Sequence, residues 1–303
     1  MPRERLLHLL ESAEAFLPVV DGSETPRDDL AGRLIANLFL ENSTRTRCSF
    51  SVAAQRLGAG TLDLLGSTSS SSKGESLVDT AANIAAMGVD AIVLRCSASG
   101  GAAMVAEHLD LPIINAGDGR HEHPTQGLLD ALSLVRHRGS TDLGGMHLAI
   151  VGDVDTSRVA RSAVYAMTSL GCDVSLIGPA SLAPDSMAGL LEGLDDTGRG
   201  TLRVLHDLDS VLPGLDAIML LRIQFERHGG GGVPGDYRAK WGLTEARCAQ
   251  LPDHAVVMHP GPVNRDLELD AVVCDGPRSL VLNQVQSGVA VRMAALLDCL
   301  GVG

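Results

Sequence analysis

The sequence predicts an α/β protein with two doubly wound parallel-sheet domains and a C-terminal helix that returns to the first domain. Short apolar runs alternate with segments of helical periodicity, which is the pattern of βαβ units. A Gly144-Gly145 pair separates two such series. Aromatic residues make up only 2% of the chain, so the cores consist mainly of Leu, Val, Ala and Ile. Such cores suit parallel strands that are covered by helices on both faces.

The first series of apolar runs predicts the N-terminal domain. Each run is followed by a helical pattern, as expected of parallel strands that are joined by helices. A helical pattern over residues 126–138 closes the series. The expected strands span residues 34–40, 60–65, 91–95 and 112–115.

The second series predicts another domain of the same class. We place the boundary near residue 138, with a first domain over residues 1–138 and a second over residues 139–282. Apolar residues at helical spacing over residues 283–303 predict a final helix that packs across the first domain. The expected strands of the second domain span residues 146–151, 173–177, 202–205, 217–220 and 255–258.

Charge and cysteine usage exclude several classes of protein. With 24 Lys and Arg residues against 37 Asp and Glu residues, the formal net charge is −13. Such a surface repels nucleic acid and anionic membranes, so we expect neither as a partner. The N-terminus lacks the apolar core of a signal peptide, and no stretch reaches the ~18 apolar residues of a membrane span. The six cysteines stand singly, so we expect a cytoplasmic protein with reduced thiols.

An anion-binding pattern follows the first expected strand. Ser43-Thr44-Arg45-Thr46 precedes a helical pattern over residues 49–57, which brings hydroxyls, backbone N–H groups and a guanidinium group to a helix start. A helix N-terminus offers N–H donors and a partial positive charge, and the arginine fork suits phosphate oxygens. On these residues alone, an ordinary capping sequence with solvent-exposed arginines is the alternative.

The same four residues resemble the carbamoyl phosphate signature of the aspartate and ornithine carbamoyltransferase family. His123-Pro124-Thr125-Gln126 resembles the second signature of that family, and residues 89–95 and 115–119 also match in order. The resemblance covers nearly all 303 residues. It implies that carbamoyl phosphate is held by Ser43, Thr44, Arg45, Thr46, Arg95, His123 and Gln126, and by the backbone carbonyls of Gly261 and Pro262 in His259-Pro260-Gly261-Pro262, where His259 is expected to be structural.

The chemistry of these side chains agrees with that role. Carbamoyl transfer needs charge neutralisation on the departing phosphate and a donor to the carbonyl oxygen, where negative charge grows during attack. Arg45 and Arg95 suit the phosphate, whereas His123 and Thr46 suit the carbonyl oxygen. Gln126 can accept a hydrogen bond from the carbamoyl NH₂. Without the surrounding motif, His123 would be interpreted as a structural histidine that is bonded to backbone.

A serine-rich run from Ser67 to Ser72 precedes Lys73. It lacks the glycine that a P-loop needs before the lysine, so no nucleotide is implied. The segment resembles the mobile loop of the family, which implies that Ser69 and Lys73 enter the active site of a neighbouring subunit in a homotrimer. Lys73 would then act in catalysis and in aspartate binding. By composition alone the segment is a solvated linker, and the effect of Ser72 in place of the family's first loop lysine is open.

The second half of the chain carries the expected amino-acid site. Residues 148–153 resemble the start of a dinucleotide-binding unit, but its second and third glycines are missing. The family resemblance implies that Arg158, Arg222 and Gln224 bind the amino acid, and arginine suits bidentate recognition of a carboxylate. The glycine-rich residues 228–235 are interpreted either as a loop that closes over substrate or as a surface loop.

The choice of acceptor depends on charge. Ornithine has a cationic side chain, and its branch of the family carries His-Cys-Leu-Pro where this chain has His259-Pro260-Gly261-Pro262. Aspartate carries two carboxylates, for which Arg158, Arg222 and Lys73 supply cations. We therefore expect carbamoyl transfer to L-aspartate, the committed step of de novo pyrimidine biosynthesis, by direct attack of the amine.

The alternatives are transfer to ornithine or another amino acid, and a non-catalytic scaffold that keeps the fold. A scaffold would lack site residues, and none is missing. We expect no cofactor, and no metal site either, because His121 and His123 have no further ligand at a supporting spacing. The sequence does not decide whether a regulatory chain or a dihydroorotase associates with the protein.

Overall fold

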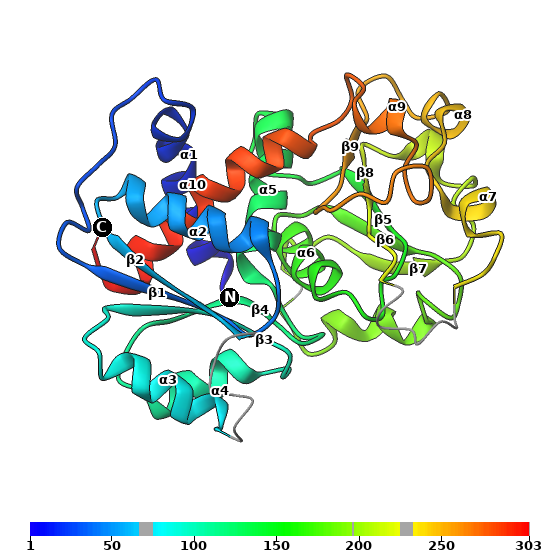
Figure 1. The fold of residues 1–303 in the computed structure, drawn as a ribbon. Coiled ribbons are helices and arrows are strands. Elements are labelled where there is room, and N and C mark those ends of the chain that lie inside the picture. Colours follow the sequence, from blue (N-terminus) through cyan, green and yellow to red (C-terminus); the bar gives the residue numbers. More distant parts are fainter. Residues whose placement is uncertain (67–74, 196, 225–232, 303) are drawn as a thin grey trace. The chain divides into compact units, whose positions relative to one another are not determined.

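A four-stranded parallel sheet forms the centre of the first part of the chain (Figure 1). Its strand order is β2-β1-β3-β4. The two central strands are apolar along nearly their whole length because helices bury both faces, whereas the edge strand β2 is largely exposed or half-buried. The four strands are β1 (Leu34–Phe39), β2 (Gly60–Leu65), β3 (Ala91–Cys96) and β4 (Ile113–Asp118).

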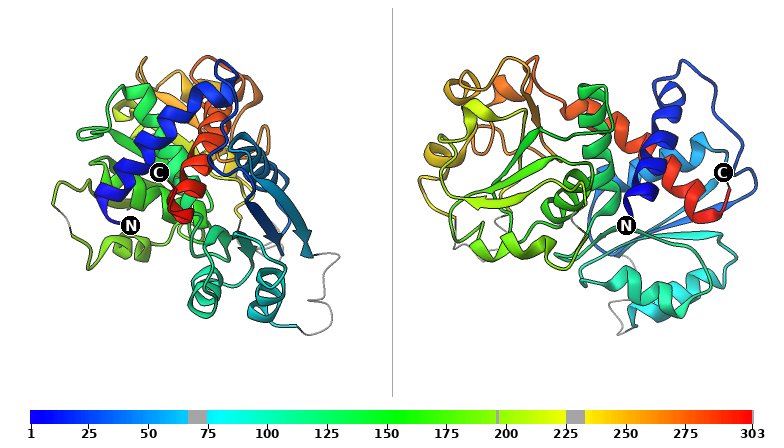
Figure 2. Two further views of the ribbon diagram at one scale, coloured as in Figure 1. Left: turned by 90° about the vertical axis from the view of Figure 1, so that its left-hand side faces the viewer. Right: turned by 180° about the vertical axis from the view of Figure 1, so that it is seen from behind.

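Helices cover both faces of this sheet. In Figures 1 and 2, α3 and α4 lie on one face, and α1, α2 and the C-terminal part of α10 lie on the other. The helix α3 begins where the Ser76 side chain accepts a hydrogen bond from the N–H of Asp79 at 3.1 Å, which is an N-cap. The helices are α1 (Arg3–Asp21), α2 (Thr44–Arg56), α3 (Leu77–Ala85), α4 (Gly101–His108), α5 (Pro124–Arg138) and α10 (Val281–Leu300).

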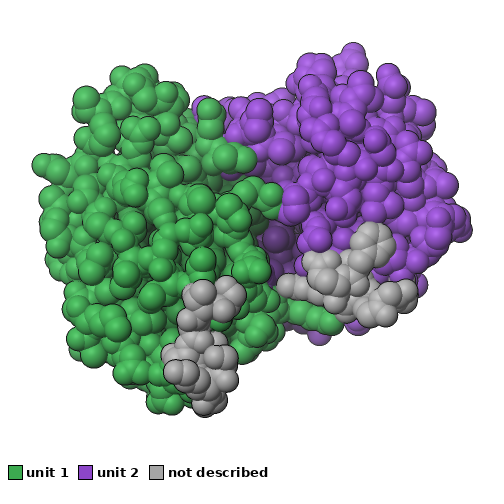
Figure 3. All heavy atoms as spheres, in the orientation of Figure 1, with its two compact units in different colours: residues 1–129, 285–303 green, residues 130–284 purple. Residues whose placement is uncertain are grey.

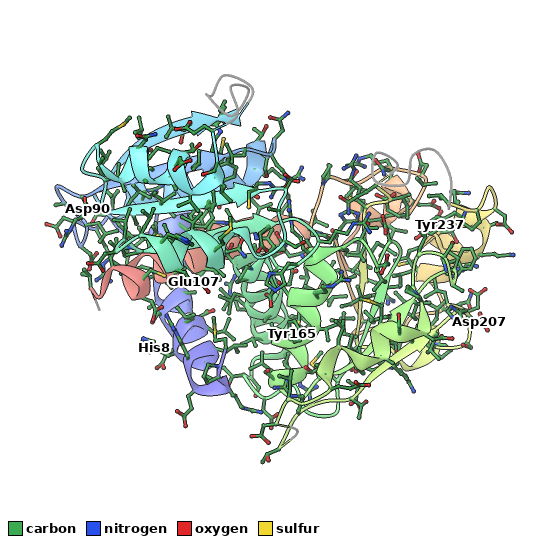
Figure 4. The ribbon with its side chains drawn as sticks, turned by 90° about the horizontal axis from the view of Figure 1, so that it is seen from below. His8, Asp90, Glu107, Tyr165, Asp207 and Tyr237 are labelled. Carbon is green, nitrogen blue, oxygen red and sulfur yellow. The ribbon has the colours of Figure 1, made fainter. Side chains whose placement is uncertain are left out.

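A five-stranded parallel sheet forms the centre of the second part, in the order β7-β6-β5-β8-β9. The strands β5, β6 and β8 are almost completely buried. Tyr237 of α7, labelled in Figure 4, is 1% exposed and packs with Trp241 into the core of this sheet. The elements are β5 (His147–Val151), α6 (Arg158–Ser169), β6 (Asp173–Ile177), η3 (Asp185–Leu191), β7 (Leu202–Leu205), η4 (Leu212–Gly214), β8 (Ala217–Leu220), α7 (Tyr237–Trp241), α8 (Glu245–Cys248), β9 (Val256–Met258) and α9 (Ala271–Cys274).

The chain divides into two units by its internal contacts (Figure 3). Unit 1 comprises residues 1–129 and 285–303, and unit 2 comprises residues 130–284. The C-terminal residues thus return to the first unit. The boundary that the sequence suggests, residue 138, coincides with the end of α5, whereas the contacts divide the chain within this helix.

The computed structural model describes residues 1–66, 75–195, 197–224 and 233–302. Every strand that the sequence predicts is present and begins within one residue of the expected position. In the described part of the chain, no helix has both the length and the apolar character needed to cross a membrane.

Candidate active site

The order of strands in unit 1 marks a place for a ligand. After β1 the chain moves to β2 on one side, and β3 then lies on the other side of β1. Ligands of open α/β sheets bind outside the carboxyl ends of the strands at such a switch point. Phe39 pairs with Arg95 in the parallel register, and the N–H of Leu40 donates to the carbonyl of Arg95 at 2.9 Å. The turn after β1 and the side chain of Arg95 therefore lie at the switch point.

The turn after β1 leads directly into α2. Ser43 is the N-cap residue with an extended backbone at φ −160°, and its side chain makes no capping hydrogen bond. The first turn of α2 contains no acidic residue. Thr44 and Arg45 are exposed, whereas Thr46 is 8% exposed. This helix start therefore presents N–H groups, hydroxyls and a guanidinium group, which together favour an anion.

Arg95 is held in place by groups from the neighbouring turns. Its Nη1 donates a hydrogen bond to the carbonyl oxygen of Ala116 at 3.2 Å. Its Nε lies 3.7 Å from a carboxylate oxygen of Glu41, and its side chain is only 14% exposed. The guanidinium group is thus fixed between the segment after β1 and the end of β4, and a fixed guanidinium group suits charge stabilisation.

The turn after β4 carries His123, which is 3% exposed and immediately precedes α5. The carbonyl of His123 accepts hydrogen bonds from the N–H groups of Gln126 at 2.9 Å and Gly127 at 3.2 Å, which start the helix. Gln126 is 8% exposed. Since β4 is next to β3, these two side chains belong to the same carboxyl edge as Arg95.

A buried carboxylate shapes this turn. Asp118, 1% exposed, accepts hydrogen bonds from the N–H groups of Gly100 at 2.8 Å and Glu122 at 2.9 Å. It also contacts the side chains of Asn115 at 3.0 Å and His121 at 3.0 Å. The sequence interpretation did not single out Asp118, although an aspartate at the end of a parallel strand is a signal that could have identified it. Asp118 defines the course of the chain toward His123.

The side chain of His121 thus contacts the carboxylate of Asp118 in this structure. Among the residues that the structure describes, no group of three or more His, Cys, Asp or Glu side chains is arranged to hold a metal ion.

Unit 2 has a switch point of its own between β5 and β8. The chain moves from β5 to β6 on one side, whereas β8 lies on the other side of β5. Val151 pairs with Leu220, and the N–H of Leu221 donates to the carbonyl of Val151 at 2.8 Å. Arg222 and Gln224, both half-buried, follow β8 at this edge.

Arg158 is the first residue of α6 and is 5% exposed. The Ser157 side chain caps this helix by accepting from the N–H of Ala160 at 3.1 Å. Gly152 lies in the turn between β5 and α6 at φ +129°, and a Cβ there would lie 3.0 Å from the carbonyl oxygen of Leu221. Only glycine allows the two segments to approach this closely, so Gly152 serves packing in a turn without the other glycines of a dinucleotide site.

The segment after β9 carries Gly261 and Pro262. Gly261 has φ +69°, a left-handed conformation that favours glycine, and the Gly261-Pro262 peptide bond is cis. The side chain of Asn264 donates to the carbonyl of Ile223 at 3.4 Å, which joins this segment to the one that bears Arg222 and Gln224. Because β9 is next to β8, both segments lie at the carboxyl edge of the unit 2 sheet.

The structure therefore groups the predicted residues of each unit at one edge of its sheet. Ser69, Ser72, Lys73 and residues 225–232, which include most of the predicted closing loop, lie outside the described residues.

Models of two protein domains match the sequence. Residues 1–136 match the aspartate/ornithine carbamoyltransferase carbamoyl-P binding domain, and residues 144–299 match the Asp/Orn binding domain. The chain belongs to the aspartate/ornithine carbamoyltransferase family. Within this family, the aspartate carbamoyltransferase catalytic subunit of Opitutus terrae is 45% identical over 303 residues, which cover 99% of this chain and 93% of that protein.

Solved structures of family members share the whole fold. Aspartate transcarbamoylase from Trypanosoma cruzi, in complex with carbamoyl phosphate and aspartate, has a TM-score of 0.87 at 30% identity. Ornithine carbamoyltransferase from Pyrococcus furiosus has a TM-score of 0.88 at 26% identity. Each comparison covers 98% of this chain and 93% of the other chain. Both branches of the carbamoyltransferase family therefore have this architecture, so the fold alone does not select the acceptor.

Proposed function

We propose that the protein transfers the carbamoyl group of carbamoyl phosphate to the amino group of L-aspartate, which yields N-carbamoyl-L-aspartate and phosphate. The observation that carries the choice of acceptor is the placement of Arg158 and Arg222 after the adjacent strands β5 and β8. Two guanidinium groups suit a dicarboxylate and oppose a cationic amino acid such as ornithine. The 45% identical relative is named an aspartate carbamoyltransferase catalytic subunit, which supports the same choice. This reaction is the committed step of de novo pyrimidine biosynthesis.

Unit 1 supplies the groups for carbamoyl phosphate in this proposal. The phosphate is bound by Ser43, Thr44 and Arg45 at the start of α2, where the helix dipole adds to the charge of the guanidinium group. Arg95 is already oriented by its bond to Ala116. Arg95 suits the phosphate, as its charge indicates, and it is also proposed to donate to the carbonyl oxygen together with Thr46 and His123.

The carbamoyl NH₂ needs acceptors. In our proposal these are the side-chain oxygen of Gln126 and the backbone carbonyls of Gly261 and Pro262. Arg158, Arg222 and Gln224 bind the amino acid. Ser69 and Lys73, which lie outside the described residues, are proposed to come from a neighbouring chain of a homotrimer. Ser69 would bind carbamoyl phosphate, and Lys73 would bind aspartate and act in catalysis.

The proposed chemistry is a direct transfer. The uncharged amine of aspartate attacks the carbonyl carbon, and negative charge grows on the carbonyl oxygen. The bond from that carbon to the phosphate oxygen then breaks, so that phosphate leaves with the electron pair of this bond and takes up the proton that the attacking nitrogen loses. No covalent enzyme intermediate is needed, because positioning and charge neutralisation bring two anionic substrates together and stabilise the transition state. We place the reaction in the cytoplasm, in keeping with the scattered single cysteines.

The test is an assay of the purified chain with carbamoyl phosphate and either L-aspartate or L-ornithine, with the carbamoyl amino acid and phosphate measured together. We expect kcat/KM for aspartate to exceed that for ornithine by at least about a hundredfold, because ornithine would place a cation beside two arginines. Equal or greater activity with ornithine would contradict the acceptor assignment. Failure to form product with either amino acid would favour the scaffold alternative.

A further inference from the structure

Two buried polar side chains hold the segment after β9. His259 is 1% exposed, and its Nδ1 accepts a hydrogen bond from the N–H of Gly261 at 2.8 Å. Since Nδ1 is an acceptor, the proton of the neutral imidazole is on Nε2. Nε2 lies 3.4 Å from Oε1 of Glu268, and neither side chain has any exposed surface.

Glu268 binds the same segment at a second point. Its Oε1 accepts a hydrogen bond from the N–H of Asn264 at 2.6 Å. His259 therefore holds the backbone immediately before the Gly261-Pro262 bond, and Glu268 holds it two residues after Pro262. The side chain of Asn264 continues to the carbonyl of Ile223, so the held segment is also tied to the end of β8.

The backbone of His259 is fixed as well. Its N–H donates to Oε1 of Gln284 at 2.9 Å, and Nε2 of Gln284 donates to Oδ1 of Asp130 at 2.7 Å. Gln284 is 3% exposed and Asp130 is 0% exposed. Backbone N–H groups of one short segment thus donate hydrogen bonds to three buried side chains, which are His259, Glu268 and Gln284.

Burying these groups is costly. A buried carboxylate beside a buried imidazole loses hydration that their mutual attraction only partly offsets, and apolar residues of similar volume would often fill such a space at lower cost. Stability alone therefore does not explain a histidine and a glutamate here. Their acceptors fix the path of residues 259–264, which carry the carbonyl groups of Gly261 and Pro262.

We propose that His259 and Glu268 are positioning residues, which hold the Gly261 and Pro262 carbonyl oxygens where they accept hydrogen bonds from the NH₂ group of carbamoyl phosphate. This inference rests on the proposed function and extends it to two residues that do not touch the substrate. The inference predicts that loss of these residues affects the binding of two ligands differently. Carbamoyl phosphate has the NH₂ group, whereas inorganic phosphate does not.

The test compares variants of His259 and Glu268 by calorimetry with freshly prepared carbamoyl phosphate and, separately, with inorganic phosphate. Glu268→Leu and His259→Leu remove the acceptors for Asn264 and Gly261. We expect each to weaken carbamoyl phosphate binding about tenfold and to lower kcat at least as much, because the carbonyl groups lose their fixed orientation. Inorganic phosphate should bind within about twofold of the wild-type affinity, because its proposed ligands are in unit 1.

Conservative variants provide the matched comparison. Glu268→Gln keeps a side-chain oxygen for the N–H of Asn264, and His259→Asn keeps an acceptor near the position of Nδ1. Both should recover much of the lost affinity for carbamoyl phosphate. If the leucine variants do not fold, Glu268→Asp and His259→Gln displace the same acceptors by about one methylene group and should show the same selective loss.

Three outcomes would overturn the inference. The first is wild-type affinity for carbamoyl phosphate in folded leucine or displaced-acceptor variants. The variants could lose both ligands equally, which would indicate general damage. The glutamine and asparagine variants could be as impaired as the leucine variants. Failure of the wild-type chain to bind carbamoyl phosphate is different, because it contradicts the proposed function itself.

Discussion

Arg47 forms an ion pair with Asp63 of β2, whereas Arg45, two residues earlier in α2, is exposed at the start of the helix. The same helix thus carries Arg47, which pairs with β2, and Arg45, which is proposed to bind phosphate. Arg45→Ala should lower kcat/KM at least about a hundredfold, because a charge-assisted contact is lost from the transition state. Steady-state kinetics with both substrates measures this effect.

Arg47→Ala is the control for Arg45→Ala. It removes an equal charge from the same helix but breaks a half-exposed ion pair, which contributes roughly 0–1 kcal/mol to stability. Its activity should stay within about threefold of wild type. Near-normal turnover of Arg45→Ala, or equal losses in the two variants, would contradict the anion site at residues 43–46.

Asp118 is predicted to control the turn that presents His123. Asp118→Ala leaves the N–H groups of Gly100 and Glu122 without their buried acceptor, which should lower the free energy of unfolding by about 3 kcal/mol or more. Denaturant unfolding measures this change, and carbamoyl phosphate affinity should fall with it. Asp118→Asn keeps one acceptor oxygen and should be intermediate. An unaltered unfolding midpoint in Asp118→Ala would show that the turn does not depend on this carboxylate.

The strands were predictable because their residues are locally consistent with the fold. In β3, five of the six residues are apolar, which is the pattern of a buried parallel strand. The strand β5 has the same pattern, with apolar residues at every position after His147. The end of β4 was less predictable. It was expected at residue 115 but runs to Asp118, through polar and glycine residues whose pairing with β3 shifts in register after Leu94. Such pairing depends on the neighbouring strand and leaves little trace in hydrophobicity.

The candidate site was predictable to a different degree in its different parts. Arg95 stands at the end of an apolar run, and Arg45 and Arg158 follow such runs, so the topology of parallel strands brings them to sheet edges. The supporting contacts were not predictable. Asp118 was not identified, and His259 was assigned only a structural role, because hydrogen bonds between residues far apart in the sequence depend on tertiary packing.

Arg222 is predicted to recognise a carboxylate of aspartate. Arg222→Ala should raise KM for aspartate at least about tenfold, because a charged hydrogen bond is lost, while calorimetry should show unchanged binding of carbamoyl phosphate to the free enzyme. Arg238→Ala is the control in the same unit, since Arg238 pairs with Asp270 at 2.6 Å on the surface. Equal loss of affinity for aspartate and for carbamoyl phosphate in Arg222→Ala would mean that the arginine maintains the structure and does not recognise the substrate.

The imidazole of His147 should make stability depend on pH. Burial and the adjacent guanidinium group of Arg203 lower the pKa of His147 below its ordinary value of 6.5. Because the pKa is lower in the folded chain, the unfolded chain binds a proton to this histidine more readily. The contribution of neutral His147 to the free energy of unfolding is therefore fully present above about pH 6.5 and is lost as the pH falls below it. Urea unfolding between pH 7.5 and 5.5 should show a smaller loss of stability in His147→Gln than in wild type.

Arg203→Gln is a second variant for this pH dependence. It removes the nearby positive charge but leaves the burial of His147, so the loss of stability at low pH should be reduced without being abolished. Identical pH profiles for wild type and His147→Gln would show that this histidine does not couple folding to protonation.

The last prediction concerns sharing of active sites between chains. In the proposed homotrimer, each site takes Arg45 from one chain and Lys73 from the next. Arg45→Ala and Lys73→Ala should therefore each be nearly inactive alone, because every site in either homotrimer lacks one cation. Mixing the two variants changes the number of complete active sites, because a chain with intact Arg45 can then lie next to a chain with intact Lys73.

A trimer with two chains of one variant and one chain of the other has three different junctions. One junction joins an intact Arg45 to an intact Lys73, the second lacks one group, and the third lacks both. One site in three should regain activity when the two variants are unfolded together and refolded, and native mass spectrometry can verify the mixed trimers. Mixed trimers that stay as inactive as their parents would mean that Lys73 acts within its own chain or not at all.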